Sequence, residues 1–247
     1  MNAGLALEIA CDGVGSALAA QSGGADRVEL FADLAAGGVT PSHGTIAVAR
    51  DRLRLPLFVL VRPRAGDFLY GDWEIEAMLE DIRHCRTLGV DGVVLGALTA
   101  EGDIDRPRCA ELISAAGGMQ VTFHRAFDAV RDPVQALQAV IDLGCTRVLT
   151  SGGQASAAAG AAALALAVRQ SAGRVRVMAG AGITADNIAG IATDTGCSDL
   201  HASAKALRSS AMQHRNPALR GLEVDYWQSD AMQVAALRAA LDAVVPL

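Results

Sequence analysis

Eight short apolar segments recur along the 247-residue chain, with stretches of helical character between them. The segments cover residues 5–11, 27–32, 55–62, 92–98, 119–125, 147–151, 174–180 and 198–203. Such alternation is typical of parallel α/β folds. Because eight regular units in so few residues leave no second domain, we predict one α/β domain over residues 1–247, a single (β/α)8 barrel. A doubly wound open sheet is the structural alternative.

The composition favours a buried core and gives no reason to expect certain partners. Hydrophobic residues make up 51% and charged residues 19%, and the net charge is -6. We therefore expect no nucleic acid and no membrane as a partner. The alanine-rich stretch 155–168 is too short and too weakly apolar for a membrane span, so we interpret it as an outer barrel helix. No secretory signal is recognisable and the five cysteines form no C-x-x-C pair, which indicates a cytoplasmic protein.

Capping residues suggest where the helices begin and end. Side chains able to accept a hydrogen bond from the first helical N–H groups occur at Ser42, Asp72, Asp132 and Thr184. Pro133 suits a first helical position. Gly89 and Gly144 suit the turns that end helices.

Side chains alternate along a barrel strand between the interior and the helix layer, so polar residues in apolar strands identify the inward positions. The residues predicted to face inward are Ala6, Glu8, Ala10, Arg27, Glu29, Phe31, Thr122 and His124. Those predicted to face the helices are Leu5, Leu7, Ile9, Val28, Leu30, Val121 and Phe123. Arg62 shares a parity with Arg64, and His201 with Ser203.

Five of these polar residues are predicted to line one cavity at the C-terminal ends of the strands, as candidate catalytic residues: Glu8, Glu29, Arg62, Arg64 and His124. Buried charges are costly unless they are paired or hold a ligand, and arginine binds carboxylate or phosphate well. We therefore expect a small anionic ligand as partner. His124 beside a glutamate would suit acid–base chemistry. A self-satisfied ion-pair network is the alternative explanation.

Glycine-containing loops after the later strands predict an anion site. Barrels often bind phosphate between the loops after the seventh and eighth strands, through backbone N–H groups. The expected ligand-binding residues are Ser151, Gly152, Gly180, Ala181, Gly182, His201 and Ser203. A plain turn explains Ser151-Gly152-Gly153 equally well. The only lysine, Lys205, is placed in a loop beyond the eighth strand, which disfavours Schiff-base chemistry. The absence of G-x-S-x-G and H-E-x-x-H motifs argues against serine hydrolases and zincins.

A set of motifs between residue 5 and about residue 220 resembles the CutC family. The motifs are Leu7-Glu8-Ile9, Gly24-Ala25-Asp26-Arg27-Val28-Glu29-Leu30, Gly37-Gly38-Val39-Thr40-Pro41-Ser42, Arg62-Pro63-Arg64, Gly66-Asp67-Phe68, Thr122-Phe123-His124-Arg125-Ala126-Phe127-Asp128, Leu149-Thr150-Ser151-Gly152, Met178-Ala179-Gly180-Ala181-Gly182, His201, Ser203 and Met212-Gln213-His214-Arg215-Asn216. The resemblance implies a cytoplasmic TIM barrel, forming a homo-oligomer and implicated in copper homeostasis, with no established reaction. It also adds Arg125 to the expected ligand-binding residues.

Copper enters as a possible cofactor through this resemblance alone. The resemblance implies that family members proposed to bind Cu(I) do so through two cysteines. This chain has Ala10 and Phe31 at those two positions. Cu(I) prefers thiolate or thioether ligands, and Cys11 is predicted to face the helices. Met178 and His201 offer one thioether and one imidazole. We therefore expect no metal ligands and no high-affinity Cu(I) site in the monomer.

Three functions stay open at this point. The chain resembles a copper-homeostasis protein of the CutC type, with copper binding that is indirect, weak or absent in this member. Its inward charges also suit a lyase or isomerase that acts on a phosphorylated or carboxylated small molecule. A non-catalytic sensor of such an anion is the third hypothesis.

Overall fold

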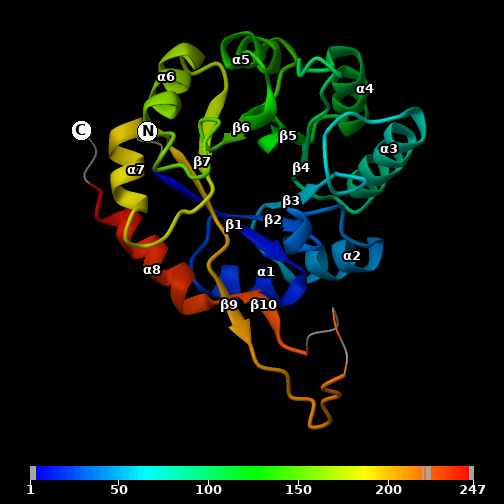
Figure 1. Cartoon of the computed structure of the whole chain (residues 1–247), viewed down its shortest axis with the longest axis vertical. Coiled ribbons are helices and arrows are strands. Elements are labelled where there is room, and N and C mark those ends of the chain that lie inside the picture. Colours follow the sequence, from blue (N-terminus) through cyan, green and yellow to red (C-terminus); the bar gives the residue numbers. More distant parts are fainter. Residues whose placement is uncertain (1–3, 219, 221–223, 245–247) are drawn as a thin grey trace.

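Eight parallel strands close into a ring with helices around it (Figure 1). The computed structural model describes residues 4–218, 220 and 224–244. The barrel strands are β1 (Ala6–Asp12), β2 (Arg27–Phe31), β3 (Leu57–Leu60), β4 (Gly92–Leu95), β5 (Gln120–Phe123), β6 (Arg147–Thr150), β7 (Arg176–Gly180) and β8 (Asp199–Ala202). They pair in chain order, and β8 pairs with β1 to close the barrel. The predicted (β/α)8 fold is confirmed, and each of the eight segments overlaps one strand.

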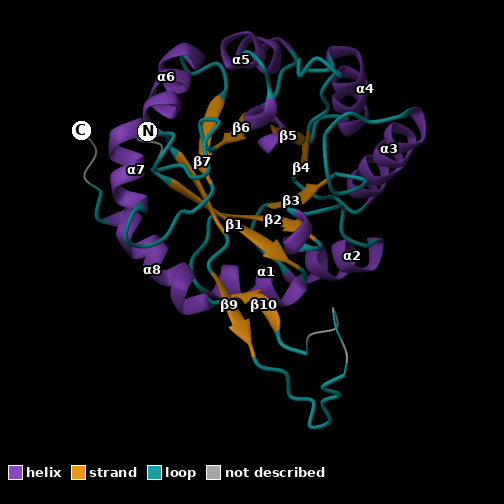
Figure 2. Cartoon of the chain, viewed as in Figure 1, coloured by secondary structure: helices purple, strands orange, loops and turns teal. Residues whose placement is uncertain are grey.

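Helices connect the strands and cover the barrel (Figure 2). They are α1 (Val14–Ser22), α2 (His43–Arg52), α3 (Asp72–Thr87), α4 (Arg106–Ala116), α5 (Pro133–Asp142), α6 (Ala161–Ser171), α7 (Ile188–Thr195) and α8 (Ala231–Asp242), with short 3-10 helices η1 (Leu34–Ala36) and η2 (Arg125–Ala129). Among the described residues, no helix is both long enough and apolar enough to cross a bilayer.

Most predicted helix boundaries hold. Ser42 and Asp132 accept hydrogen bonds from the first N–H groups of α2 and α5. The position of α3 is confirmed, but Asp72 is its first residue rather than its cap, which is Gly71. Gly89 and Gly144 have positive φ just beyond helix ends, as predicted.

Two boundaries are wrong. The helix expected at Thr184 begins at Ile188 instead, because the Asn187 side chain accepts from the Thr184 N–H group and holds the preceding residues as a turn. The helix interpreted over 155–168 is α6, and it begins at Ala161.

The buried side chains separate into an outer and an inner apolar cluster, which confirms the predicted alternation. Leu7, Ile9 and Cys11 belong to the large cluster between strands and helices. The inner cluster consists of Phe31, Phe58, Leu60 and Val94, with Ala10 and Leu34 packed against it. The inward faces of the strands are therefore free to carry the polar side chains described below.

A two-stranded hairpin, not predicted from the sequence, follows β8. Strand β9 (Lys205–Arg208) pairs antiparallel with β10 (Tyr226–Ser229) and leads into α8. Ser229 anchors the hairpin at the barrel: its Oγ donates to the Ser203 carbonyl (2.9 Å), and its N–H group donates to Ser16 Oγ (3.0 Å). The loop position expected for Lys205 is therefore wrong, because Lys205 is the first residue of β9.

Candidate functional site

The N-terminal half of the barrel interior holds an ion network that we call the lower layer: Arg27, Phe58, Arg147, Met178 and Asp199. Asp199 is fully buried and accepts from Arg27 (3.0 Å) and Arg147 (3.1 Å). Arg176 reaches the same carboxylate from the barrel's end (3.4 Å). The charged side chains of the lower layer are thus paired with one another.

Packing completes the lower layer. The guanidinium carbons of Arg27 and Arg147 each lie 5.2 Å from the centroid of the Phe58 ring, a distance suited to cation–π contact. A Cβ atom at Gly92 would lie 2.2 Å from Phe58, so glycine is needed there for the ring to fit. Met178 Sδ accepts from Arg27 at 3.4 Å. These residues fill the N-terminal end of the barrel.

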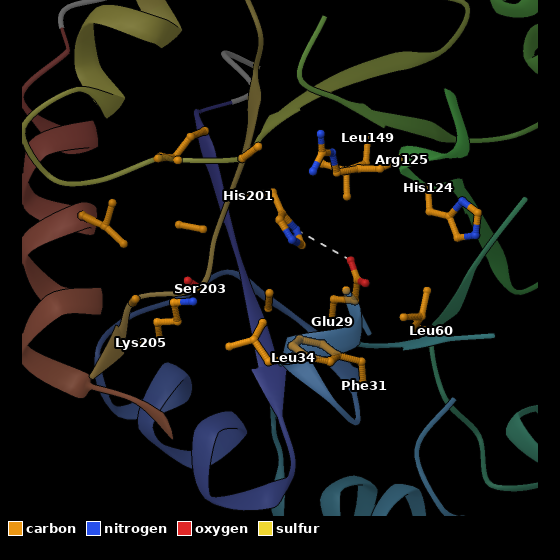
Figure 3. Close-up of a pocket in the computed structure, with 18 of the residues that line it drawn as sticks. Glu29, Phe31, Leu34, Leu60, His124, Arg125, Leu149, His201, Ser203 and Lys205 are labelled. Carbon is orange, nitrogen blue, oxygen red and sulfur yellow. Dashed lines mark ion pairs between the residues drawn. The ribbon is translucent and has the colours of Figure 1, made fainter. Parts of the chain in front are cut away.

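Above this layer lies a cluster of two carboxyl groups and an imidazole from three adjacent strands, which we call the floor cluster: Glu8, Glu29 and His201. His201 Nδ1 lies 2.8 Å from Glu8 Oε1 and 3.7 Å from Glu29 Oε2. Figure 3 shows the His201 ring directed toward the Glu29 carboxylate. Glu8 also pairs with Arg27 below it. Glu29 Oε2 is buried and has no hydrogen-bond partner.

The environment shifts the pKa values of the floor cluster in different directions. Burial alone would raise the pKa of Glu8, but the charge of Arg27 and the hydrogen bond with His201 lower it to about 2. Burial raises the pKa of Glu29 to about 7, and the Glu8 charge adds to the rise while that of His201 opposes it. Burial opposes protonation of His201, yet its hydrogen bond with Glu8 and the two carboxylate charges raise its pKa.

Arg62 supplies a positive charge that no described carboxylate neutralises. Its Nη1 donates to the Ala36 and Gly38 carbonyls (3.0 and 2.8 Å), and its Nη2 donates to the Gly66 carbonyl (2.7 Å). Its Nε is buried and has no partner. The guanidinium lies 5.0 Å from the centroid of Phe68. Carbonyl groups thus hold Arg62 in place without cancelling its charge.

His124 lies against the same phenylalanine. Its ring centroid is 5.0 Å from that of Phe68, and its Nδ1 accepts from the Ala126 N–H group at 3.2 Å. The proton of the neutral ring therefore belongs on Nε2, which is buried without a partner. Burial, together with the charge of Arg62, lowers the pKa of His124 to about 3. A histidine that stays neutral at pH 7 suits hydrogen-bond donation better than the acid–base role predicted for it.

A cavity of about 660 Å³ opens at the C-terminal ends of the strands. Figure 3 shows Glu29 and His201 of the floor cluster, together with His124, among the residues that line it. Arg62 also lines it. Its other polar lining residues include Arg125, Thr184, Ser203, Lys205 and Gln233. Apolar side chains, among them Phe31, Leu60 and Leu149, cover much of the remaining wall.

The structure brings most of the predicted site residues to this cavity. Those that line it are Glu29, Arg62, His124, Arg125, Ala181, Gly182, His201 and Ser203. Glu8 lies directly behind His201. Arg64 is the exception among the candidate catalytic residues, because its side chain is partly exposed and pairs with Glu74 and Asp67. Since β3 ends at Leu60, the strand alternation used to place Arg64 does not extend that far.

Ser151, Gly152 and Gly180 are not among the residues that line the cavity. The Asp128 carboxylate accepts from the N–H groups of Ser151 and Gly153 (both 3.0 Å), so this segment is an anchored turn. Ser151 Oγ accepts from Arg125 at 3.0 Å and thereby positions that arginine. At Gly180 a Cβ would lie 2.6 Å from Leu149, so its lack of a side chain makes room within the barrel.

Several residues of the lower layer and of the cavity were missed from the sequence. Asp199 has the parity of His201, and Arg147 has that of Leu149, so the alternation applied to the other strands would have found both. Gln233 and Leu237 reach the cavity from α8. No sequence pattern marks those two, because their place depends on how the last helix closes the ring.

The cysteines do not converge on the cavity. All five are free and buried. Cys11 Sγ donates to the Ile9 carbonyl, and burial raises the pKa of this thiol. Within the described ranges, the floor cluster is the only set of three or more His, Cys, Asp or Glu residues whose ligand atoms all lie within 4.8 Å of one another. It contains no sulfur.

The CutC family model matches residues 5–206. The chain belongs to the CutC family. A CutC family protein of Chromobacterium violaceum is 51% identical over 241 residues, which cover 96% of this chain and 98% of that protein. A CutC family protein of Bacteroides thetaiotaomicron is 50% identical over 213 residues, 86% of each chain.

Solved structures agree with this assignment. A CutC protein of Streptococcus agalactiae, whose name assigns it to copper homeostasis, matches with a TM-score of 0.78 and 32% identity, covering 81% of this chain and 98% of its own. Thiamine phosphate pyrophosphorylase of Pyrococcus furiosus matches with a TM-score of 0.61 at 16% identity, covering 98% of each chain. The second likeness shows the barrel fold alone.

Proposed function

We propose that this CutC family barrel binds a small molecule bearing a carboxylate or phosphate group and acts on it as a lyase or isomerase. The observation that carries the proposal is the convergence on one cavity of three buried side chains with unpartnered polar atoms: Glu29, Arg62 and His124. Unpaired buried polar atoms are rare in native proteins and call for an explanation. A ligand that pairs with them supplies one.

The anionic character of the ligand follows from the charge on Arg62. A buried guanidinium without a carboxylate is costly, and an anion in the cavity offsets that cost. Like Arg62, His124 contacts Phe68, and its neutral Nε2–H group offers the ligand a second hydrogen-bond donor. Arg125 and Lys205 contribute further positive charge to the lining.

A catalytic role is favoured over a sensor by the floor cluster. Binding an anion needs donors only, whereas the floor cluster places two carboxyl groups beside an imidazole at the bottom of the cavity. Carboxylates would repel the anionic group of the ligand, so they are expected to face another part of it and to take part in the reaction there. Barrel enzymes carry their reactive groups at the C-terminal ends of the strands, where this cavity lies.

Direct Cu(I) chemistry is not part of this proposal. The inward positions Ala10 and Phe31 carry no sulfur, and the Met178 thioether is engaged by Arg27. A role in copper homeostasis is suggested for this chain only by the name of the Streptococcus agalactiae relative. We extend the proposal to a cytoplasmic homo-oligomer, for which the five free thiols support the reducing compartment.

Thermal shift tests the anion site. The purified protein is heated in the presence of inorganic phosphate or of a panel of small di- and tricarboxylates. We expect a concentration-dependent rise in Tm that is lost in Arg62→Gln. Arg64→Gln is the matched control, because Arg64 lies outside the cavity, and it should keep the shift. An equal shift in Arg62→Gln and the unsubstituted protein, or no shift with any anion, would contradict the proposal.

A further inference from the structure

We infer that the floor cluster, Glu8, Glu29 and His201, binds a divalent cation such as Zn²⁺, Mn²⁺ or Fe²⁺. The inference concerns the same cavity as the proposed function and rests on that function only for what the cation does to a bound ligand. The binding itself is argued from three observations about the cluster: its spacing, its support and its one unsatisfied oxygen.

The spacing of the three ligand atoms suits one ion. Nδ1 of His201 lies 2.8 Å from Glu8 Oε1 and 3.7 Å from Glu29 Oε2, and all three atoms are within 4.8 Å of one another. Bonds of about 2.1 Å to a cation place neighbouring ligand atoms about 3.0 to 3.4 Å apart. The observed separations lie on either side of this interval, so small side-chain movements complete the site.

The barrel holds the ligands in position from behind. Glu8 on β1 is in register with His201 on β8, and Ala10 on β1 is in register with Glu29 on β2. Arg27 binds Oε2 of Glu8, which leaves Oε1 facing His201. Such partners behind the ligands are typical of metal sites, because they fix the orientation of the coordinating groups.

Glu29 has a buried oxygen without a hydrogen-bond partner, and this is the third observation. The residue is 5% exposed, it lines the cavity, and its Oε2 has no hydrogen-bond partner. A buried carboxylate oxygen normally accepts hydrogen bonds or coordinates an ion. Because this oxygen is the one closest to His201 Nδ1 on Glu29, a cation between them satisfies it.

The ligand set indicates which cations fit. Two carboxylates and one imidazole are oxygen and nitrogen donors, which suit Zn²⁺, Mn²⁺ and Fe²⁺, whereas Cu(I) prefers sulfur. Two negative charges match a divalent ion. With only three protein ligands, two of which line the cavity, coordination positions stay open, as in catalytic rather than structural metal sites. A cation there would act as a Lewis acid toward the ligand of the proposed function.

Direct metal binding tests the inference without any substrate. Protein freed of metal with a chelator and dialysed is titrated calorimetrically with ZnCl2 or MnCl2. We expect one ion per chain. Glu29→Gln should weaken binding by about tenfold or more, because the shape is kept and the charge is lost. Glu111→Gln, which alters an exposed carboxylate on α4, is the control and should bind as the unsubstituted protein does.

Cobalt gives a second readout that does not depend on affinity alone. CoCl2 added to the metal-free protein should produce visible absorption bands of a coordinated ion, and His201→Gln should abolish or shift them. Circular dichroism of each variant establishes that it is folded. Fewer than one ion per five chains, or binding unchanged in Glu29→Gln, would overturn the inference.

The two proposals fail separately. Loss of metal binding together with an anion-induced rise in Tm that depends on Arg62 would remove the cation and leave the proposed function standing. Stoichiometric metal binding with no response to any anion would do the reverse.

Discussion

The lower layer and the cavity above it both bury charged side chains inside the same barrel, yet they differ in how those charges are used. Asp199 is shared by three arginines, and Met178 and Phe58 complete their surroundings. One layer higher, Glu29 Oε2, Arg62 Nε and His124 Nε2 are buried without partners. Buried charge alone therefore does not mark a functional site. The proposed function rests instead on unused hydrogen-bonding capacity that faces a cavity.

The largest effect on stability is expected from removing Asp199, the carboxylate at the centre of the lower layer. Asp199→Ala leaves Arg147 buried without a carboxylate and removes one of the two carboxylates that Arg27 binds. Breaking a buried ion pair from one side costs about 3–5 kcal/mol. We expect the free energy of unfolding, measured by urea titration, to fall by that amount. A loss below about 1 kcal/mol would mean that the lower layer is not the structural half of the barrel interior.

A smaller effect is expected from His124 as the pH is lowered. Its pKa is about 3 in the folded protein, against an ordinary value of 6.5. The unfolded chain therefore takes up a proton on this residue below pH 6.5, whereas the folded protein does not until about pH 3. The contribution of His124 to the free energy of unfolding is fully present above pH 6.5 and falls as the pH drops. By pH 5 it has fallen by about 2 kcal/mol.

The measurement compares unfolding at pH 7 and pH 5 in the unsubstituted protein and in His124→Asn. Asparagine does not titrate in this range, so the variant should lose about 2 kcal/mol less between the two pH values. The same pH dependence in both proteins would show that other groups dominate the acid destabilisation.

The smallest effect should come from Glu29. Glutamine has nearly the same shape, and Glu29 Oε2 makes no hydrogen bond that the substitution would break. In metal-free protein at pH 8 we therefore expect Glu29→Gln to change the free energy of unfolding by less than about 1 kcal/mol, with a stabilising sign because burial disfavours the charged carboxylate, whose pKa it raises to about 7. A loss comparable to that of Asp199→Ala would place Glu29 in the structural network instead.

The fold was predictable from local patterns, but only part of the site was. The eight segments and the parity of Glu8, Glu29 and Arg27 follow from alternation along a strand, which every residue of a strand obeys. Arg64 fails this rule because β3 stops at Leu60.

What sequence could not separate was the lower layer from the cavity. Inward parity is the same for Arg27 and Glu29, which are two residues apart on β2. Their different roles depend on partners from other strands: Asp199 is within reach of Arg27, and a cavity lies beside Glu29. The hairpin was missed for a related reason, because β9 and β10 are far apart in sequence and each is only four residues long.

The Phe58 ring, which contacts two guanidinium groups and fits where Gly92 leaves space for it, also bears on the rates of binding and release. Because the lower layer fills the N-terminal end of the barrel, a ligand is expected to enter and leave the cavity at the C-terminal ends of the strands. The segments that follow β7 and β8 there, Gly182 to Ala185 and Ser203 to Lys205, line the cavity. A bulkier side chain at this rim that leaves the bound contacts untouched should slow association and dissociation by the same factor. Residence time would lengthen while Kd stays constant.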